Sequence, residues 1–97
     1  MSILHTLNTS PFQTYALQQC LVLMGEQDEL LLIEDGVVAA QAKHPMFEQL
    51  TLLAEQGRLF VLAPDLEARG FTNIIGQQYS YHDFVQLMTK HQSQMAW

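Results

Sequence analysis

Runs of consecutive apolar residues are the strongest pattern along this chain. The segment DELLLIED is apolar without interruption from Leu30 to Ile33, and RLFVLA, residues 58–63, forms a second such run. Because alternate side chains of a strand point to opposite faces, an unbroken apolar run indicates a strand that is covered on both sides. The segment ILHTLN, residues 3–8, predicts a further strand because it is short and rich in branched residues, and residues 77–79 predict a weak one.

Helical signals lie between these predicted strands. Ser10 offers an N-cap hydroxyl and Pro11 the favoured first helical position, so we predict a helix from there to about Gly25. A second helical stretch follows over residues 36–57, with an interruption near 44–45 and a glycine at its end.

The later part of the chain carries two more helical signals. Residues 64–70 predict one or two turns, and Ser80 with Asp83 three residues on is the pattern of a capping box at the start of the last helix. Strands that alternate with helices along the whole chain indicate a parallel sheet. We therefore predict an α/β fold: a single small three-layer domain over residues 1–97, with a mainly parallel sheet of about four to five strands flanked by helices.

The composition narrows the classes of function. Ten acidic residues against four scattered basic ones give a formal net charge of −6, so we expect no direct binding of nucleic acid. Charged residues make up 14% of the chain, against about 25% in an average soluble domain, which favours a surface buried against partner subunits; twelve glutamines are the alternative explanation. The sequence shows neither an apolar run of membrane-spanning length nor the pattern of a signal peptide, so we expect a soluble, cytoplasmic protein without membrane contact.

The sequence lacks the motifs of the commonest small α/β domains. The turn NTSPF after the first predicted strand has no glycine that would admit a dinucleotide phosphate, and no GxxxxGK[ST], HExxH or HxH pattern occurs. A single cysteine cannot form an internal disulfide or a zinc site built on thiolates. We predict no cofactor and no metal site.

Cys20 is the first candidate for chemistry. On a helix from residue 11 to 25 it lies near the middle of an apolar stripe that also contains Phe12, Ala16, Leu23 and Met24. A thiol that faces the sheet is a small buried hydrophobe with a raised pKa, so we predict a packing role for it. A slightly rotated stripe would instead leave Cys20 at its edge, within reach of another chain.

Three other polar residues stand out. Glu34 and Asp35 close the second predicted strand at the carboxyl edge of the sheet, where paired carboxylates could perform acid–base chemistry or hold a hard cation. The alternative is that Asp35 caps the next helix and Glu34 is solvated. His5, in the first predicted strand, is interpreted as a satisfied core or interface histidine rather than a ligand.

The closing residues KHQSQMAW contain a large apolar group at a chain end. Chain ends fray unless something holds them, and a loose end is a poor place for an indole. We predict that Met95 and Trp97 dock, either on the chain's own body or at a subunit interface.

Several segments together resemble the TusB/DsrH family. They are ILHTLN followed by SPF, DELLLIEDGVVAA, VLAPDLEARGF, YHDFVQL and KHQSQMAW, so the resemblance runs nearly from end to end. It implies a small α/β subunit of a heterohexameric sulfur-relay complex, together with paralogous subunits of the TusC/DsrF and TusD/DsrE types. Upstream and downstream sulfur carriers would act through this complex, which in its tRNA-modifying form supports 2-thiolation of the wobble uridine.

The resemblance also bears on Cys20. The sulfur-carrying cysteine of such complexes belongs to the TusD/DsrE-type subunit, which implies a structural, non-catalytic role for this chain in the sulfurtransferase complex. The alternative is a DsrH-like subunit of a dissimilatory sulfur-oxidation complex, in which Cys20 accepts persulfide sulfur. The closing KHQSQMAW resembles the TusB branch, which we follow. A free-standing binding domain that uses Glu34 and Asp35 is a third hypothesis.

Overall fold

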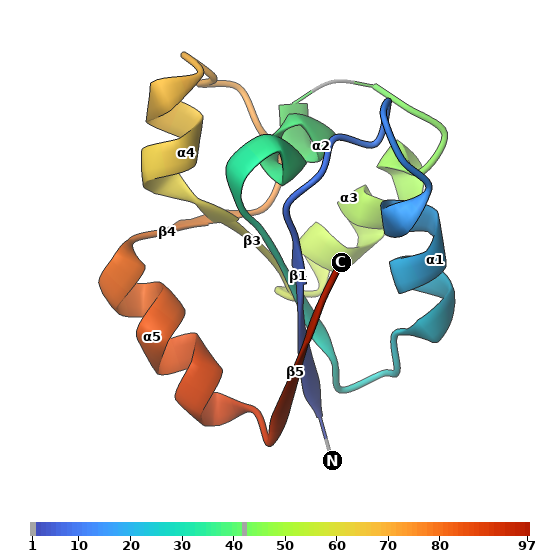
Figure 1. Ribbon diagram of the computed structural model, residues 1–97, viewed down its shortest axis with the longest axis vertical. Coiled ribbons are helices and arrows are strands. Elements are labelled where there is room, and N and C mark those ends of the chain that lie inside the picture. Colours follow the sequence, from blue (N-terminus) through green and yellow to red (C-terminus); the bar gives the residue numbers. More distant parts are fainter. Residues whose placement is uncertain (1, 42) are drawn as a thin grey trace.

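A five-stranded parallel sheet forms the centre of the computed structural model, which describes residues 2–41 and 43–97 (Figure 1). The strand order is β4-β3-β2-β1-β5, and every neighbouring pair is parallel. The predicted α/β class with a mainly parallel sheet flanked by helices is confirmed. The strands are β1 (Ile3–Leu7), β2 (Glu29–Leu32), β3 (Leu59–Leu62), β4 (Gln77–Tyr79) and β5 (Ser93–Ala96).

Helices cover both faces of the sheet. Figure 1 shows α1 and α3 on one side and α5 on the other. The first strands are added in one direction, from β1 to β4, and the chain then returns to place β5 beyond β1. Because parallel crossovers are right-handed, this reversal puts α5 on the opposite face. The helical segments are α1 (Ala16–Leu23), the 3₁₀ turn η1 (Glu34–Val37), α2 (Val38–Gln41), α3 (Phe47–Glu55), α4 (Ala63–Ala68) and α5 (Tyr81–Lys90).

The two central strands explain the apolar runs of the sequence. All four residues of β2 and all four of β3 are buried, as expected for strands with helices above and below. Their alternate side chains enter two separate cores. The larger core lies on the α1 side and includes Leu30, Leu32, Val61 and Cys20, whereas the α5 side holds Leu4, Leu31, Phe60 and Leu87.

The predicted capping box of α5 is present. The Ser80 hydroxyl oxygen accepts a hydrogen bond from the Asp83 N–H at 3.1 Å, and Asp83 Oδ2 accepts one from the Ser80 N–H at 3.0 Å. Both donors would otherwise be unsatisfied at the helix N-terminus. The local sequence therefore defines where this helix begins.

The first helix begins later than predicted, so that prediction was wrong. Ser10 does cap a turn, because its hydroxyl oxygen accepts a hydrogen bond from the Phe12 N–H at 3.2 Å, and the backbone N–H groups of residues 13 and 14 donate to its carbonyl oxygen. The turn ends there, and a second hydroxyl, Thr14 Oγ1, accepts a hydrogen bond from the Ala16 N–H at the start of α1. Serine and threonine side chains compete in this way with continuous helical hydrogen bonding. As a result Phe12 and Leu23, which we placed on the buried stripe, are exposed.

The tail of the chain becomes a strand. β5 pairs with β1 in a register that places Ser93 opposite Ile3 and Ala96 opposite Thr6. The Trp97 N–H then donates to the Thr6 carbonyl oxygen at 2.8 Å and continues the ladder. Figure 1 shows β5 running alongside β1, so the end of the chain forms one edge of the sheet.

Candidate functional site

Cys20 lies inside the larger core. Its side chain is 0% exposed, and it packs between α1 and the sheet with Leu17 as the other buried residue of that helix. Burial, together with the negative charge of Asp28, raises the pKa of the Cys20 thiol to about 12. At neutral pH the sulfur is therefore a protonated thiol and not a nucleophilic thiolate.

A buried chain of hydrogen bonds joins Trp97, His5 and Asp28. Trp97 Nε1 donates to His5 Nδ1 at 3.0 Å, and His5 Nε2 lies 2.9 Å from Asp28 Oδ2. The indole N–H can only donate, so Nδ1 of His5 must be unprotonated and Nε2 must carry the proton that is donated to Asp28. His5 is thus a satisfied core histidine, 1% exposed and stacked on the Trp97 ring with centroids 6.2 Å apart.

Asp28 is the anionic centre of this network. Burial on its own would raise the pKa of Asp28, but hydrogen bonds from the Gly25 N–H, from His5 and from the Ile3 N–H outweigh that effect and lower the pKa. Arg58 supports the same turn, because its Nε donates to the Asp28 carbonyl oxygen at 2.8 Å. The carboxylate therefore ties β1, the turn before β2 and the end of the chain together.

The hydrogen bonds of this network determine which groups are free to react with a thiol. Both ring nitrogens of His5 are already engaged, so the imidazole is not free to take a proton from Cys20. Within residues 2–41 and 43–97, every fully buried side-chain nitrogen or oxygen has a hydrogen-bond partner. In the same part of the chain no three His, Cys, Asp or Glu side chains converge as they would around a metal ion, and no helix is long and apolar enough to cross a membrane.

A second buried network holds the start of β5 on the other face. Glu29 accepts a hydrogen bond from His91 Nε2 at 2.7 Å. It also forms an ion pair with Lys90, whose Nζ lies 3.1 Å from Glu29 Oε1. His91 Nδ1 lies 2.8 Å from the Ser2 hydroxyl oxygen. The residues before β5 are therefore fixed to both β1 and β2.

Glu34 and Asp35 do not form a shared carboxylate site. Both side chains are exposed, and Asp35 Oδ1 pairs with Arg69 Nη2 at 2.7 Å. The alternative that Asp35 caps the next helix is wrong, because Asp35 lies inside η1 and its carboxylate pairs with Arg69. Instead Asp65 Oδ2 accepts a hydrogen bond from the Glu34 N–H at 2.7 Å, where Glu34 adopts a left-handed φ of 49°.

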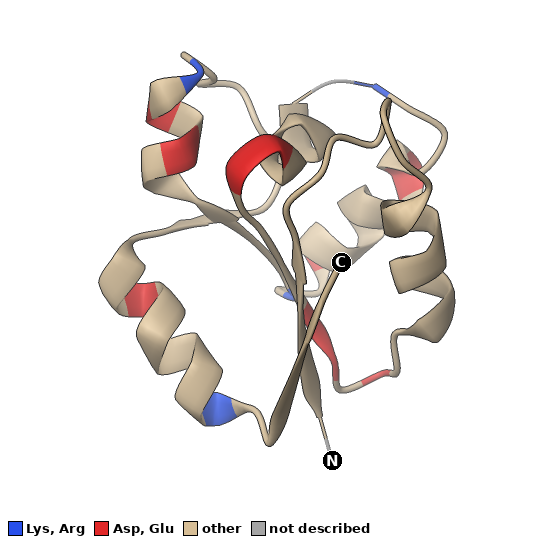
Figure 2. Cartoon of the chain, in the orientation of Figure 1, with Lys and Arg blue, Asp and Glu red and all other residues tan. Residues whose placement is uncertain are grey.

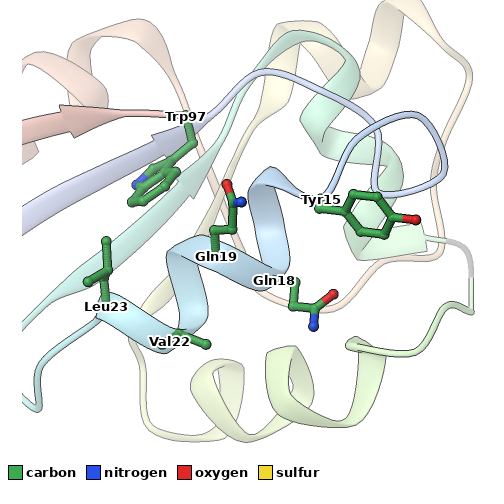
Figure 3. Close-up of a pocket in the computed structure, with 6 residues that line it drawn as sticks. All are labelled: Tyr15, Gln18, Gln19, Val22, Leu23 and Trp97. Atoms are coloured by element: carbon green, nitrogen blue, oxygen red, sulfur yellow. The ribbon is translucent and has the colours of Figure 1, made fainter.

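The two tail residues differ in their surroundings. Trp97 is half-buried and packs against the larger core, so it docks on the chain's own body. Met95 is 39% exposed on the edge strand β5. A groove lies between Trp97 and α1, and Figure 3 shows the Trp97 indole beside this helix, with Gln19 and Leu23 extending toward it.

Asp28 is the residue of this network that sequence reasoning missed. It sits in the polar segment GEQDE, which reads as an ordinary solvated turn. The signal that could have found it is its place directly before β2, because the neighbouring strand β1 carries a histidine with which a carboxylate can pair. That pairing becomes visible only when β1 and β2 are aligned in register, with His5 opposite Leu30.

Replacing Asp28 should lower stability in a pH-dependent way. Because the folded-state pKa is lowered, the carboxylate's contribution is present above its unfolded pKa of about 3.9 and is lost as the pH falls through the folded-state value. We expect Asp28→Asn to lower the free energy of unfolding by about 2 kcal/mol at neutral pH, and by less below about pH 4. Denaturant unfolding at a series of pH values measures this difference.

The exposed neighbour Glu26 provides the control, since Glu26→Gln should change the free energy of unfolding by less than about 0.5 kcal/mol. A loss in Asp28→Asn that stays constant across the acid range would contradict the role of the ionised carboxylate.

Comparison with known proteins shows similarity over the whole chain. Residues 9–94 match the family model described as DsrH like protein. Protein TusB of Pectobacterium parmentieri is 42% identical over 98 residues, which cover 98% of this chain and 100% of that relative. Protein TusB of Escherichia coli O1:K1 / APEC and that of Shigella boydii serotype 18 are each 43% identical with the same coverage.

A solved structure shares the architecture at low identity. It is a protein of unknown function from Methanobacterium thermoautotrophicum, and it superimposes with a TM-score of 0.67 over 98% of this chain and 96% of that chain. The sequence identity is 16%, so this likeness describes the fold alone.

Proposed function

The chain belongs to the TusB/DsrH family of sulfur-relay subunits, and from this premise we propose that it is a structural subunit of a cytoplasmic sulfur-relay complex that thiolates tRNA. In this proposal it assembles with paralogous TusC/DsrF-type and TusD/DsrE-type subunits into a heterohexamer. The complex receives sulfur from an upstream carrier and passes it to a downstream one, for 2-thiolation of the wobble uridine. The similarity to proteins named TusB over essentially the full chain supports this branch of the family.

The burial of Cys20 is the observation that carries the structural role. A sulfur carrier needs a thiolate that donor and acceptor proteins can reach. Cys20 is fully buried, its pKa is raised to about 12, and both ring nitrogens of His5 are engaged in hydrogen bonds. The chain therefore contributes shape and contacts to the relay, and the persulfide resides on another subunit.

The charge of the chain is consistent with a relay between proteins. The net charge is −6, and Figure 2 shows the basic positions far apart, at the ends of α5 and α4 and in separate loops. A tRNA backbone would meet no continuous basic surface there. Contact with the tRNA is left to the enzyme downstream of the relay.

The second candidate is a DsrH-like subunit of a sulfur-oxidation complex in which Cys20 accepts persulfide sulfur. Burial of the thiol opposes that role, since a persulfide donor would have to reach the interior of the larger core.

Deletion of the gene should abolish 2-thiouridine at the tRNA wobble position, and the Cys20→Ala variant should restore it to within about twofold of the wild-type level. The reason is that the variant removes only a packing thiol. Nucleoside mass spectrometry of total tRNA measures the modification. A thermal melt of the purified variant checks its folding.

Two outcomes would contradict the proposal in different parts. Normal tRNA thiolation in the deletion strain would contradict the proposed role of this chain in tRNA thiolation. Restoration by wild type but not by a folded Cys20→Ala variant would instead assign the sulfur-carrying role to Cys20.

A further inference from the structure

The outer side of α1 is unusually apolar for a solvent-facing helix. Tyr15, Val22 and Leu23 are 79%, 81% and 61% exposed, while the inner side of the same helix buries only Leu17 and Cys20. We name this region the α1 surface; it comprises Tyr15, Gln18, Gln19, Val22, Leu23 and Trp97, which together line a groove of about 730 Å³ (Figure 3).

The spacing of these residues makes a continuous strip. Tyr15, Gln18 or Gln19, and Val22 follow one another at the three- and four-residue intervals that lie on one side of a helix. Trp97 extends the strip from the helix to the end of β5. Exposed apolar residues that occur singly are ordinary, but a contiguous strip with a groove is typical of an interaction site.

The α1 surface carries no charge. Residues 11–25 and 92–97 contain no Asp, Glu, Lys, Arg or His, although the whole chain carries ten acids. Figure 2 shows α1 and β5 without coloured positions, while acidic residues mark α3, α4, α5 and the turn before β2. Depletion of charge at the centre is what distinguishes an interface from the remaining protein surface.

An unprotected sheet edge adjoins this surface. All four residues of β5 are exposed, and its sequence SQMA has neither the charges nor the proline that usually keep an edge strand from pairing with another chain. The Met95 side chain lies on the same face of the sheet as Trp97, because the two residues are two apart in the strand.

The net charge argues against a second copy as the occupant. Two copies would each bring a charge of −6, and the α1 surface offers no basic group to offset that repulsion. The matching partner is a less acidic chain that presents an uncharged, apolar helix face of its own. Under the proposed function, the paralogous subunits are the chains available to present such a face.

We propose that the α1 surface and the adjoining β5 edge are the contact through which this chain binds a paralogous α/β subunit of the relay complex. This inference rests on the proposed function and specifies which side of the molecule faces the partner. The α5 side, including the exposed Val85, then faces solvent or a weaker contact.

A matched pair of variants tests this assignment. Val22→Glu places a charge in the α1 surface, and Val85→Glu places the same charge on the opposite face at a residue that is 58% exposed. Each variant is co-expressed with the organism's TusC/DsrF-type and TusD/DsrE-type subunits, and complex formation is measured by native mass spectrometry. Circular dichroism confirms that both variants fold, which their exposure leads us to expect.

We expect Val22→Glu to weaken assembly at least about tenfold and Val85→Glu to leave it within about twofold, because only the former buries an unpaired charge. Normal assembly of Val22→Glu, or equal loss in Val85→Glu, would overturn the inference while leaving the proposed function intact. Formation of a homodimer that Val22→Glu abolishes would also overturn it, because the occupant would then be a second copy. If the wild-type chain assembles with neither subunit, the proposed function itself is contradicted.

Discussion

Native Cys20 should react with a soluble thiol reagent at pH 7 at least about 100-fold more slowly than the same cysteine in the unfolded chain. A pKa of about 12 in place of about 8.5 lowers the thiolate fraction by about 10³·⁵. The higher intrinsic nucleophilicity of such a thiolate recovers about 10¹·⁵ of this factor, which leaves about 10². The complete burial of the side chain slows the reaction further, since the reagent needs a local opening to reach the sulfur.

The comparison is made by following labelling in native buffer and in concentrated guanidinium chloride. A double variant, Gln18→Cys with Cys20→Ala, serves as the matched control because it moves the sole thiol to an exposed position on the same helix. That variant should label at a rate near that of the unfolded chain. Rapid labelling of the native wild type would show that Cys20 is accessible, and the structural role proposed for it would then be withdrawn.

Substitution of Gly36 by alanine should destabilise the chain by about 3 kcal/mol or more. A Cβ atom at this position would lie 2.1 Å from the Leu7 carbonyl oxygen and 2.8 Å from its carbon. Neither atom can yield easily, because they belong to the backbone at the end of β1, where the same oxygen accepts a hydrogen bond from the Ile33 N–H at 2.9 Å. Overpacking against flexible side chains costs about 1–3 kcal/mol, so a clash with fixed backbone should reach or exceed the top of that range.

Gly25→Ala is the matched control for this measurement. The nearest atom to a Cβ at residue 25 is Asp28 Oδ2 at 3.8 Å, an ordinary contact distance. Its free energy of unfolding, measured by denaturant titration, should stay within about 1 kcal/mol of wild type. A Gly36→Ala protein as stable as Gly25→Ala would show that β1 and η1 can separate without cost.

Local signals in the sequence were sufficient to predict much of the fold. The apolar runs of β2 and β3 could be read as doubly covered strands because burial on both faces makes the consecutive residues 30–32 and 59–62 apolar. The start of α5 could be read from Ser80 and Asp83 because a capping box involves residues only three apart. The start of α1 could not, because two hydroxyl residues competed for the same turn and only the folded structure selects between them.

The hydrogen-bonded network of Trp97, His5 and Asp28 could not be predicted from such local signals. His5 lies 23 residues from Asp28 and 92 residues from Trp97 in the sequence. Their meeting depends on the order of the strands, with β2 and β5 on either side of β1. Burial of Cys20 was predicted, but from a stripe of which Phe12 and Leu23 proved to be exposed. The thiol is buried because it shares the inner side of α1 with Leu17 instead.

The position of β5 has a consequence for biosynthesis. β1 leaves the ribosome before β5, yet one of its two hydrogen-bonding edges is completed only by residues 93–96. A nascent chain can already pair β1 with β2 and bury Cys20, but its other edge stays open until the final strand has been released. Because such distant pairing is slow to form, the partly made subunit depends on that last segment to avoid joining its exposed edge to a neighbouring chain.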